Sequence, residues 1–234
     1  MRANFYIDGF NLYYLRLKAQ PHHKWLNYKA LADRIVPAGT TVHKVKYYTA
    51  PVSGKLDLDA PKRQQALFSA LRTVPEIETF HGRFLFSQRY AGLVHPPRAK
   101  PDSYVWNLPP PDVVLVQKAE EKGSDVNLGV HLVRDAFVDL FDVAYVITDD
   151  TDLVEPIRIV SQEVGKPVCV VAPCRPHRRT RGGLSYLHPV PAPSLQTVAS
   201  FIHYLDDAEL AAAQFPPAIN RPGKKPVLRP PTWV

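Results

Sequence analysis

Three carboxylates stand within four residues in the stretch 144–160, which reads AYVITDDTDLVEPIRIV. They are Asp149, Asp150 and Asp152, and they lie between an apolar run typical of a buried strand and a pattern suited to a helix. Carboxylates this close repel one another and are costly to keep ionised unless a cation is near. Because a hard divalent metal such as Mg²⁺ is the usual cation for oxygen ligands, the stretch is a candidate metal site.

Acidic residues stand at two other points where a strand is expected to give way to a helix. Asp8 follows the first apolar segment, and Asp125 opens the strongest helical pattern, at 124–137. In open α/β sheets ligands bind at the carboxyl edge of the strands, so Asp8, Asp125, Asp150 and Asp152 are expected to converge there. Such a cluster could hold one or two Mg²⁺ or Mn²⁺ ions, and a pair of ions can activate a water and stabilise the leaving oxygen in phosphodiester cleavage.

Each acidic residue also has a structural interpretation. Asp152 could cap a helix, with Glu155 completing a capping box. Asp8 could form an Asx-turn. Asp125 could favour the positive end of its helix, with Ser124 as the N-cap. Capping explains each residue singly, but it explains less well why all of them would lie at one edge of a sheet.

Strand and helix patterns alternate along the chain, which predicts an α/β protein with a mostly parallel sheet and helices on both faces. Two further strand-like segments, 83–86 and 113–118, are expected to pair antiparallel, and 173–193 is expected to form a basic, proline-rich loop. The main expected strands are 4–7, 42–49, 77–80, 143–148, 167–172 and 201–204, and the main expected helices are 12–18, 28–35, 61–71, 124–137 and 153–164.

Composition places limits on the class of protein. The chain has 234 residues, a formal net charge of +7 and only two cysteines. An excess of basic residues favours polyanionic partners. The low number of cysteines suggests reduced thiols, as in a cytoplasmic protein. We find no signal peptide and no apolar run of about 18 residues, so no membrane partner is expected. The sequence contains neither a GxGxxG nor a GxxxxGK[ST] motif, which disfavours dinucleotide and P-loop nucleotide binding.

Three short blocks together resemble a known family. The sequence reads DGFNL at 8–12, EKGSDVNL at 121–128 and TDDTDL at 148–153. In this order and spacing the blocks resemble the signature blocks of NYN domains, the LabA-like branch of the PIN-like nucleases. The resemblance covers roughly residues 3–205 and implies a Rossmann-like α/β/α sandwich with a metal-dependent ribonuclease site.

Carried over residue by residue, the resemblance implies a set of site residues. Asp8, Asp125, Asp150 and Asp152 would be catalytic and would bind Mg²⁺ or Mn²⁺. Asn11 would orient a ligand, a water or a phosphate. The resemblance therefore implies an endoribonuclease that hydrolyses single-stranded or structured RNA.

Two positions depart from the commonest pattern of this family. Asp149 stands where many relatives have Gly or Asn, which adds negative charge beside the site. His131 stands where many relatives have a further Asp. Because His131 points about 120° away from Asp125 on a helix, we expect it to lie behind the metal ligands or to be packed, with Asp135 as its partner.

Positive charge that could contact RNA phosphates is concentrated in one loop. The predicted phosphate contacts there are Arg175, Arg178, Arg179 and Arg181. Lys122 is either a solvated turn residue or a further phosphate contact. The alternative for the whole arginine cluster is a solvated loop.

The domain organisation expected is a nuclease domain at 1–206 followed by a proline-rich tail at 207–234. Trp233 would pack either on the body of the protein or on a second copy in a homodimer. Near the site, Tyr13 and Tyr14 could stack on bases, although packing of at least one of them on the sheet is favoured.

Two other functions fit parts of the sequence. The first is an RNA-binding regulatory module with the same fold and little or no catalysis. The second is a phosphatase with Asp8 as an aspartyl nucleophile. The phosphatase ranks last because that chemistry usually needs a second acid two residues on, where this chain has Phe10.

Overall fold

The structure of the protein is a computed structural model that describes residues 1–54, 57–93, 112–181, 184–188 and 190–234. Within 177–189 only the backbone of two strands is described.

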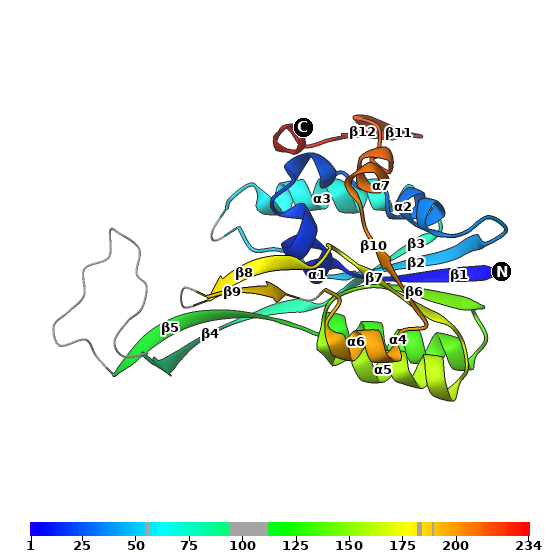
Figure 1. The fold of residues 1–234 in the computed structure, drawn as a ribbon. Helices are drawn as coiled ribbons and strands as arrows, with labels where there is room; N and C mark the ends of the chain where they lie inside the picture. The colour runs from blue at the N-terminus through cyan, green and yellow to red at the C-terminus, as the bar shows by residue number, and fades with distance from the viewer. Residues whose placement is uncertain (55–56, 94–111, 182–183, 189) are drawn as a thin grey trace.

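A six-stranded parallel sheet forms the centre of the molecule (Figure 1), in the order β10-β7-β6-β1-β2-β3. All five strand pairs are parallel. The predicted α/β class, a Rossmann-like α/β/α sandwich with a mostly parallel sheet, is therefore confirmed. The strands are β1 (Arg2–Asp8), β2 (Thr41–Thr49), β3 (Ile77–His81), β6 (Val143–Ile147), β7 (Val168–Ala172) and β10 (Phe201–Tyr204).

Helices cover both faces of this sheet. In Figure 1, α2, α3 and α7 lie above the sheet, and α4, α5 and α6 lie below it. The helix α1 (Gly9–Leu12) leaves β1 directly and continues as a π-helix, Tyr13–Leu17. The other helices are α2 (Tyr28–Ile35), α3 (Ala60–Leu71), α4 (Ser124–Phe137), α5 (Val154–Arg158), α6 (Pro193–Val198) and α7 (Asp207–Ala212).

The alternation of side chains along β1 divides the core into two layers. Phe5 and Ile7 are fully buried in the layer with α2 and α3. Tyr6 is fully buried in the opposite layer, which contains α4 and α5. Because successive side chains of a strand point to opposite faces, Asp8 is directed to the same face as Tyr6, toward α4.

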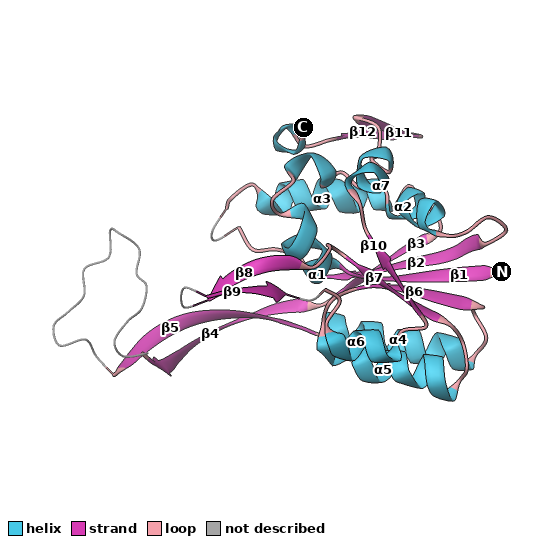
Figure 2. Ribbon diagram, in the orientation of Figure 1, coloured by secondary structure: helices cyan, strands magenta, loops and turns pink. Residues whose placement is uncertain are grey.

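A two-stranded antiparallel ribbon projects from the body (Figure 2). It consists of β4 (Arg83–Gly92) and β5 (Val113–Lys122), paired along their whole length. This confirms the predicted antiparallel pair and extends it. Gly82 joins β3 to the ribbon, and a Cβ there would lie 2.8 Å from the backbone carbonyl oxygen of Lys122, so a glycine suits this close approach.

The chain after 206 forms regular elements that contribute to the core, so the irregular structure predicted for 207–234 is wrong, while the division into domains at 206 stays a prediction. It forms α7, the hairpin of β11 (Ala218–Arg221) and β12 (Lys224–Leu228), and a 3₁₀ turn, Pro231–Trp233. Trp233 is only 9% exposed, and its ring centroid lies 6.3 Å from that of Trp25. Of the two alternatives for Trp233, packing on the body is confirmed. The prolines do limit each element to a few residues, but short elements can still pack.

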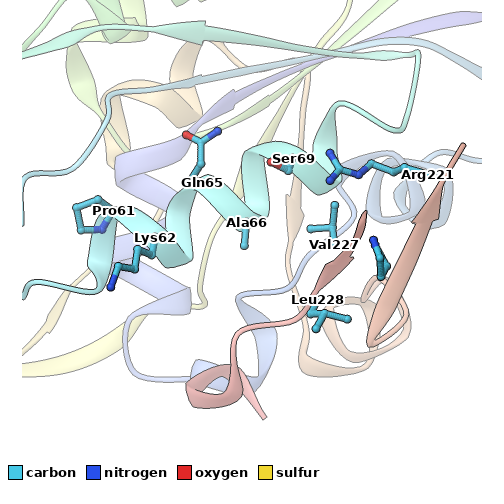
Figure 3. Close-up of a pocket in the computed structure, with 9 residues that line it drawn as sticks. Pro61, Lys62, Gln65, Ala66, Ser69, Arg221, Val227 and Leu228 are labelled. Carbon is cyan, nitrogen blue, oxygen red and sulfur yellow. The ribbon is translucent and has the colours of Figure 1, made fainter. Parts of the chain in front are cut away.

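A hollow of about 690 Å³ lies between α3 and the β11–β12 hairpin (Figure 3). Its lining includes Lys62 from α3 and Arg221 from the hairpin, together with the apolar side chains of Val227 and Leu228. The residues that line this hollow include no carboxylate. It is therefore separate from the acidic cluster described below.

Two other segments differ from expectation. Residues 173–193, predicted to be a loop, contain a hairpin of β8 (His177–Arg181) and β9 (Leu184–His188). The helix predicted at 153–164 is a composite of a 3₁₀ turn, Thr151–Leu153, then α5, then a π-helix, Ile159–Glu163. No helix in the described part of the chain is long and apolar enough to cross a membrane.

Candidate metal centre

Asp8 is the last residue of β1 and lies at the carboxyl edge of the sheet. Asp8 is 3% exposed; its Oδ1 accepts a hydrogen bond from the Asn11 backbone N–H at 2.9 Å, and its Oδ2 accepts one from the Thr148 hydroxyl at 3.1 Å. Gly9 follows because a Cβ there would lie 2.5 Å from the carbonyl oxygen of Tyr48. The turn thus holds Asp8 in one orientation, and the predicted local turn at Asp8 exists as the N-cap of α1.

The carboxyl end of the neighbouring strand β6 supplies Asp150. Thr148 donates to Asp8 and accepts from the Asp150 backbone N–H at 3.0 Å, so one hydroxyl links the two acidic segments. The Oδ1 of Asp150 accepts from the Asp152 backbone N–H at 3.0 Å and caps the 3₁₀ turn. Asp150 is therefore the cap, and the predicted capping box of Asp152 with Glu155 is wrong.

The first turn of α4 supplies Asp125 from the other side. Gly123 stands at the N-cap with φ 103°, a left-handed conformation that favours glycine. Ser124 is already helical, and its hydroxyl donates to the Glu121 carboxylate at 2.8 Å, so the prediction of Ser124 as the N-cap is wrong. Because the helix begins after Gly123, Asp125 lies in the first turn of α4 and is directed toward Asp8 and Asp150.

Three of the four predicted acids come together. One carboxylate oxygen from each of Asp8, Asp125 and Asp150 lies within 4.8 Å of the other two. Burial, followed by the charges of Asp125 and Asp150, raises the pKa of Asp8 to about 7. Burial, followed by the charge of Asp150, raises the pKa of Asp125 to about 6. The cluster therefore resists full ionisation near neutral pH unless a cation neutralises it.

The donor set of this cluster fits a hard divalent ion. All three donors are carboxylate oxygens, which suit Mg²⁺ or Mn²⁺ better than softer metals. Opposite ligands of an Mg²⁺ ion lie about 4.2 Å apart, twice its usual metal–oxygen distance of about 2.1 Å. The spread of at most 4.8 Å is close enough for small side-chain rotations to bring the oxygens into contact with one ion.

Asp152 lies just outside the group of three. Its side chain is exposed, and its charge contributes to the raised pKa of Asp125. Asp125 and Asp152 both border a cleft of about 730 Å³ between α4 and α5. The rest of that cleft is largely apolar, with Val126, Val130, Val133, Pro156 and Ile159 among its lining residues.

Asn11 joins the two acidic segments through its side chain. Its Oδ1 accepts a hydrogen bond from the Asp149 backbone N–H at 2.8 Å. The Asp149 carboxylate accepts in turn from the Ala192 backbone N–H at 2.7 Å, at the start of α6. The negative charge of Asp149, unusual for the family it resembles, is thus bound to a backbone group and lies outside the group of three acids.

Of the basic residues predicted to contact RNA, the structure describes the side chains of Lys122 and Arg175. The Nζ of Lys122 lies 3.3 Å from a carboxylate oxygen of Glu120, so Lys122 forms an ion pair within the ribbon. The guanidinium of Arg175 lies 5.4 Å from the ring centroid of Tyr204. The side chains of Arg178, Arg179 and Arg181 lie outside the described part of the structure, and their RNA contacts stay predictions.

His131 lies away from the metal centre. Its Nδ1 is 3.0 Å from the Tyr48 hydroxyl, and its ring packs edge-on against Phe80 at 4.6 Å. The expectation that His131 is packed is therefore confirmed. Asp135, its expected partner, accepts instead from the Lys46 ammonium at 2.5 Å and from the Tyr6 hydroxyl at 2.7 Å.

Two groups near the centre were not predicted from the sequence. Thr148 bridges the acidic segments, and Glu121 raises the pKa of Asp125 through its charge. The signal for Thr148 was its place at the end of the β6 pattern, directly before the acids. No sequence pattern indicated the role of Glu121, because its position near Asp125 depends on how the β4–β5 ribbon leads into α4.

No known protein-family model matches the chain. The chain is similar to 6-hydroxy-3-succinoylpyridine 3-monooxygenase HspA of Pseudomonas putida (strain DSM 28022 / S16), with 27% identity over 262 residues, which covers 100% of this chain and 75% of the relative. By its name, that relative is an enzyme. A solved structure of a protein of unknown function from Vibrio parahaemolyticus RIMD 2210633 gives a TM-score of 0.47 with 17% identity, covering 88% of this chain and 93% of that one.

Proposed function

We propose that the protein is an enzyme, a divalent-metal-dependent endoribonuclease of the NYN and PIN-like type. The observation that supports this most is the convergence of Asp8, Asp125 and Asp150 at the carboxyl edge of a parallel sheet, within 4.8 Å of one another. That edge is where ligands bind in open α/β folds. The sequence blocks that resemble NYN domains contain these same residues.

The roles of the residues follow from their contacts. Asp8, Asp125 and Asp150 would hold the metal, which when bound would supply an activated water and neutralise charge on the scissile phosphate. Thr148 and the Asn11 side chain keep the β1 and β6 segments in register at the centre. Asp152 borders the same centre from the cleft side, where it can accept a hydrogen bond from an incoming water.

Cleavage of a mixed RNA pool tests this proposal. We expect cleavage with Mn²⁺ or Mg²⁺, none with EDTA, and a loss of roughly 100-fold or more in Asp150→Asn, because the remaining ligands hold metal and water poorly. Asp33→Asn is the matched control, since Asp33 is exposed and pairs with Lys29 on α2.

The outcomes separate the hypotheses. Equal rates in wild type and Asp150→Asn would refute the assignment of the metal centre. Metal-independent RNA binding without cleavage would instead favour an RNA-binding regulatory module with the same fold.

A second candidate function is oxygenation of a small heteroaromatic acid. It is favoured by the 27% identity, over the whole of this chain, to an enzyme named a pyridine-derivative monooxygenase. The apolar cleft of about 730 Å³ has a volume suited to such a ligand, and Arg134 on its border could pair with a ligand carboxylate.

Oxygen consumption tests the second function. The protein is mixed with 6-hydroxy-3-succinoylpyridine and a nicotinamide reductant, with and without added flavin or iron. Val130→Trp should block the cleft and abolish substrate-dependent oxygen uptake. Substrate-dependent uptake in wild type, together with no RNA cleavage under any metal condition, would replace the first proposal by the second.

A further inference from the structure

A pair of exposed tyrosines follows the metal centre along the chain. Tyr13 is 37% exposed and Tyr14 is 61% exposed, so both rings have surface that is open to solvent. Their ring centroids lie 5.3 Å apart in an edge-to-face arrangement. Such rings offer flat apolar faces that can stack on other aromatic groups.

Each tyrosine ring carries a lysine ammonium above it. The Nζ of Lys18 lies 5.2 Å from the centroid of Tyr14, and the Nζ of Lys24 lies 5.3 Å from the centroid of Tyr13. Burial and the positive charges of Arg63 and Lys18 lower the pKa of Lys24. In the described part of the chain, no carboxylate comes within 4.0 Å of either ammonium, whereas Arg63 pairs with Asp57. The patch therefore carries positive charge that is not neutralised by an ion pair.

The helical path connects this patch to the acidic cluster. Asp8 caps α1, and Asn11 on that helix bonds to the β6 segment that carries Asp150. Tyr14 lies three residues beyond Asn11, in the π-helical segment that continues α1 without a break. The π-helical segment Tyr13–Leu17 then places Lys18 over the Tyr14 ring. A chain bound at the centre would meet Tyr14 and Lys18 as it leaves along α1.

We propose that Tyr13, Tyr14, Lys18 and Lys24 form a subsite for single-stranded nucleic acid, in which bases stack on the tyrosines and phosphates contact the lysines. The inference rests on the proposed ribonuclease function, since it describes where that substrate would extend beyond the scissile bond. Single strands suit the patch because their bases can be splayed out onto aromatic rings, whereas the bases of a duplex are already stacked. An anionic lipid or a phosphopeptide would use the lysines but would gain little from two tyrosine faces.

Binding of a 5′-fluorescein-labelled 12-nucleotide oligouridylate tests the base contact. The titration is done in EDTA, so that no cleavage occurs and the metal centre plays no part. Tyr14→Ala should weaken binding by about 5- to 150-fold, while Tyr14→Phe should retain most of the affinity, since stacking needs the ring and not the hydroxyl. Phe137→Ala is the matched control, because Phe137 is a 67% exposed aromatic residue at the far end of α4.

An abasic oligomer of the same length separates stacking from charge. It should bind wild type more weakly than oligouridylate and should not respond to Tyr14→Ala. An equal loss for both oligomers in Tyr14→Ala would overturn the stacking contact. Thermal unfolding of each variant is measured in parallel, and an unchanged melting temperature with weakened binding supports a direct contact.

The lysines are tested through the salt dependence of binding. Each phosphate contact to a single strand contributes about 0.7 to the slope of log affinity against log salt. Lys18→Gln with Lys24→Gln should therefore flatten the slope by about 1.4. The control is Lys224→Gln with Lys225→Gln, which removes the same charge from two exposed residues in the β12 segment. Equal slopes in the two double variants would overturn the phosphate contacts.

The two proposals fail in different ways. Tyrosine- and lysine-dependent binding in EDTA without metal-dependent cleavage would refute the ribonuclease and leave the subsite standing. Asp150-dependent cleavage with full affinity in Tyr14→Ala and in the Lys18, Lys24 double variant would refute the subsite and leave the ribonuclease standing. Tyrosine-independent binding to vesicles of anionic lipid, with no binding of oligouridylate, would replace the nucleic acid by a membrane surface.

Discussion

Replacing Asp8 by asparagine should stabilise the metal-free protein at neutral pH. The Asp8 carboxyl is 3% exposed and lies against Asp125 and Asp150, so its ionised form is disfavoured in the folded state. Its pKa is raised from 3.8 to about 7, with burial as the largest cause. The ionised carboxylate of Asp8 thus weakens the metal-free fold, and its neutral isostere asparagine should relieve that cost.

The magnitude follows from the pKa. A group with a raised pKa binds its proton more tightly in the folded state, so stability falls as pH rises from the unfolded value through the folded value. For Asp8 the full deficit, present above pH 7, is about 4 kcal/mol at about 1.36 kcal/mol per pH unit. The amide group that replaces Oδ2 in Asp8→Asn could not accept the Thr148 hydrogen bond, which costs about 1 kcal/mol. The net gain is about 3 kcal/mol at pH 8.

Urea denaturation in EDTA at pH 5 and pH 8 measures this effect. We expect Asp8→Asn to exceed wild type by about 3 kcal/mol at pH 8 and by less than about 1 kcal/mol at pH 5, where wild-type Asp8 is largely protonated. For a chain of this size the gain at pH 8 corresponds to a rise in melting temperature of about 6–12 °C.

Asp33→Asn is the control, because Asp33 is exposed on α2 and carries no comparable burial. It should not change how stability depends on pH between pH 5 and pH 8. If Asp8→Asn and wild type showed the same pH dependence over that range, Asp8 would not be a strained carboxylate, and the electrostatic description of the centre would be wrong.

The metal, the C-terminal segment and the buried ion pair each give a further prediction. Saturating Mg²⁺, at about 100 times its dissociation constant, should stabilise wild type by about 2.7 kcal/mol in thermal unfolding; a gain of equal size in the Asp8→Asn, Asp150→Asn double variant would place the ion elsewhere. Trp233→Ala should cost about 3–5 kcal/mol in urea denaturation because Trp233 is 9% exposed against Trp25, and a cost below about 1 kcal/mol would make the C-terminal segment a passive tail. Lys46→Met should cost about 3–5 kcal/mol in the same assay, since it removes the nearer of two cations from the fully buried Asp135 and leaves Arg134 at 3.9 Å; a neutral result would show that water reaches Asp135.

Local patterns were enough to predict the class of the fold. The alternation of apolar strand and helix segments predicted a parallel sheet covered on both faces, which the order of strands confirms. The antiparallel pairing of the strands that contain 83–86 and 113–118 was also correct, although residues 83–86 pair with 119–122. The fold class depends on periodicity and on central strands such as β6 and β7, which are buried over their whole length; both are visible in a linear sequence.

Caps and chain ends were predicted less well. Ser124 and Asp152 both have residue types that favour N-caps, yet Gly123 and Asp150 occupy those positions. Several residue types can cap a helix, and which residue becomes the N-cap depends on where the preceding strand ends. Residues 207–234 were expected to be irregular because of their prolines, but proline limits the length of an element and not its burial.

Strand ends and helix starts have local signals, so the amino-acid sequence was enough to predict that acidic residues follow the strands of a parallel sheet. Which of these residues meet depends on the packing of segments that are far apart in the chain. The central position of β1 beside β6, the side-chain alternation that turns Asp8 toward α4, and the glycine at 123 bring Asp8, Asp125 and Asp150 together. Asp152 is equally acidic in sequence and lies outside that group, since two residues along a turn are enough to point a carboxylate elsewhere.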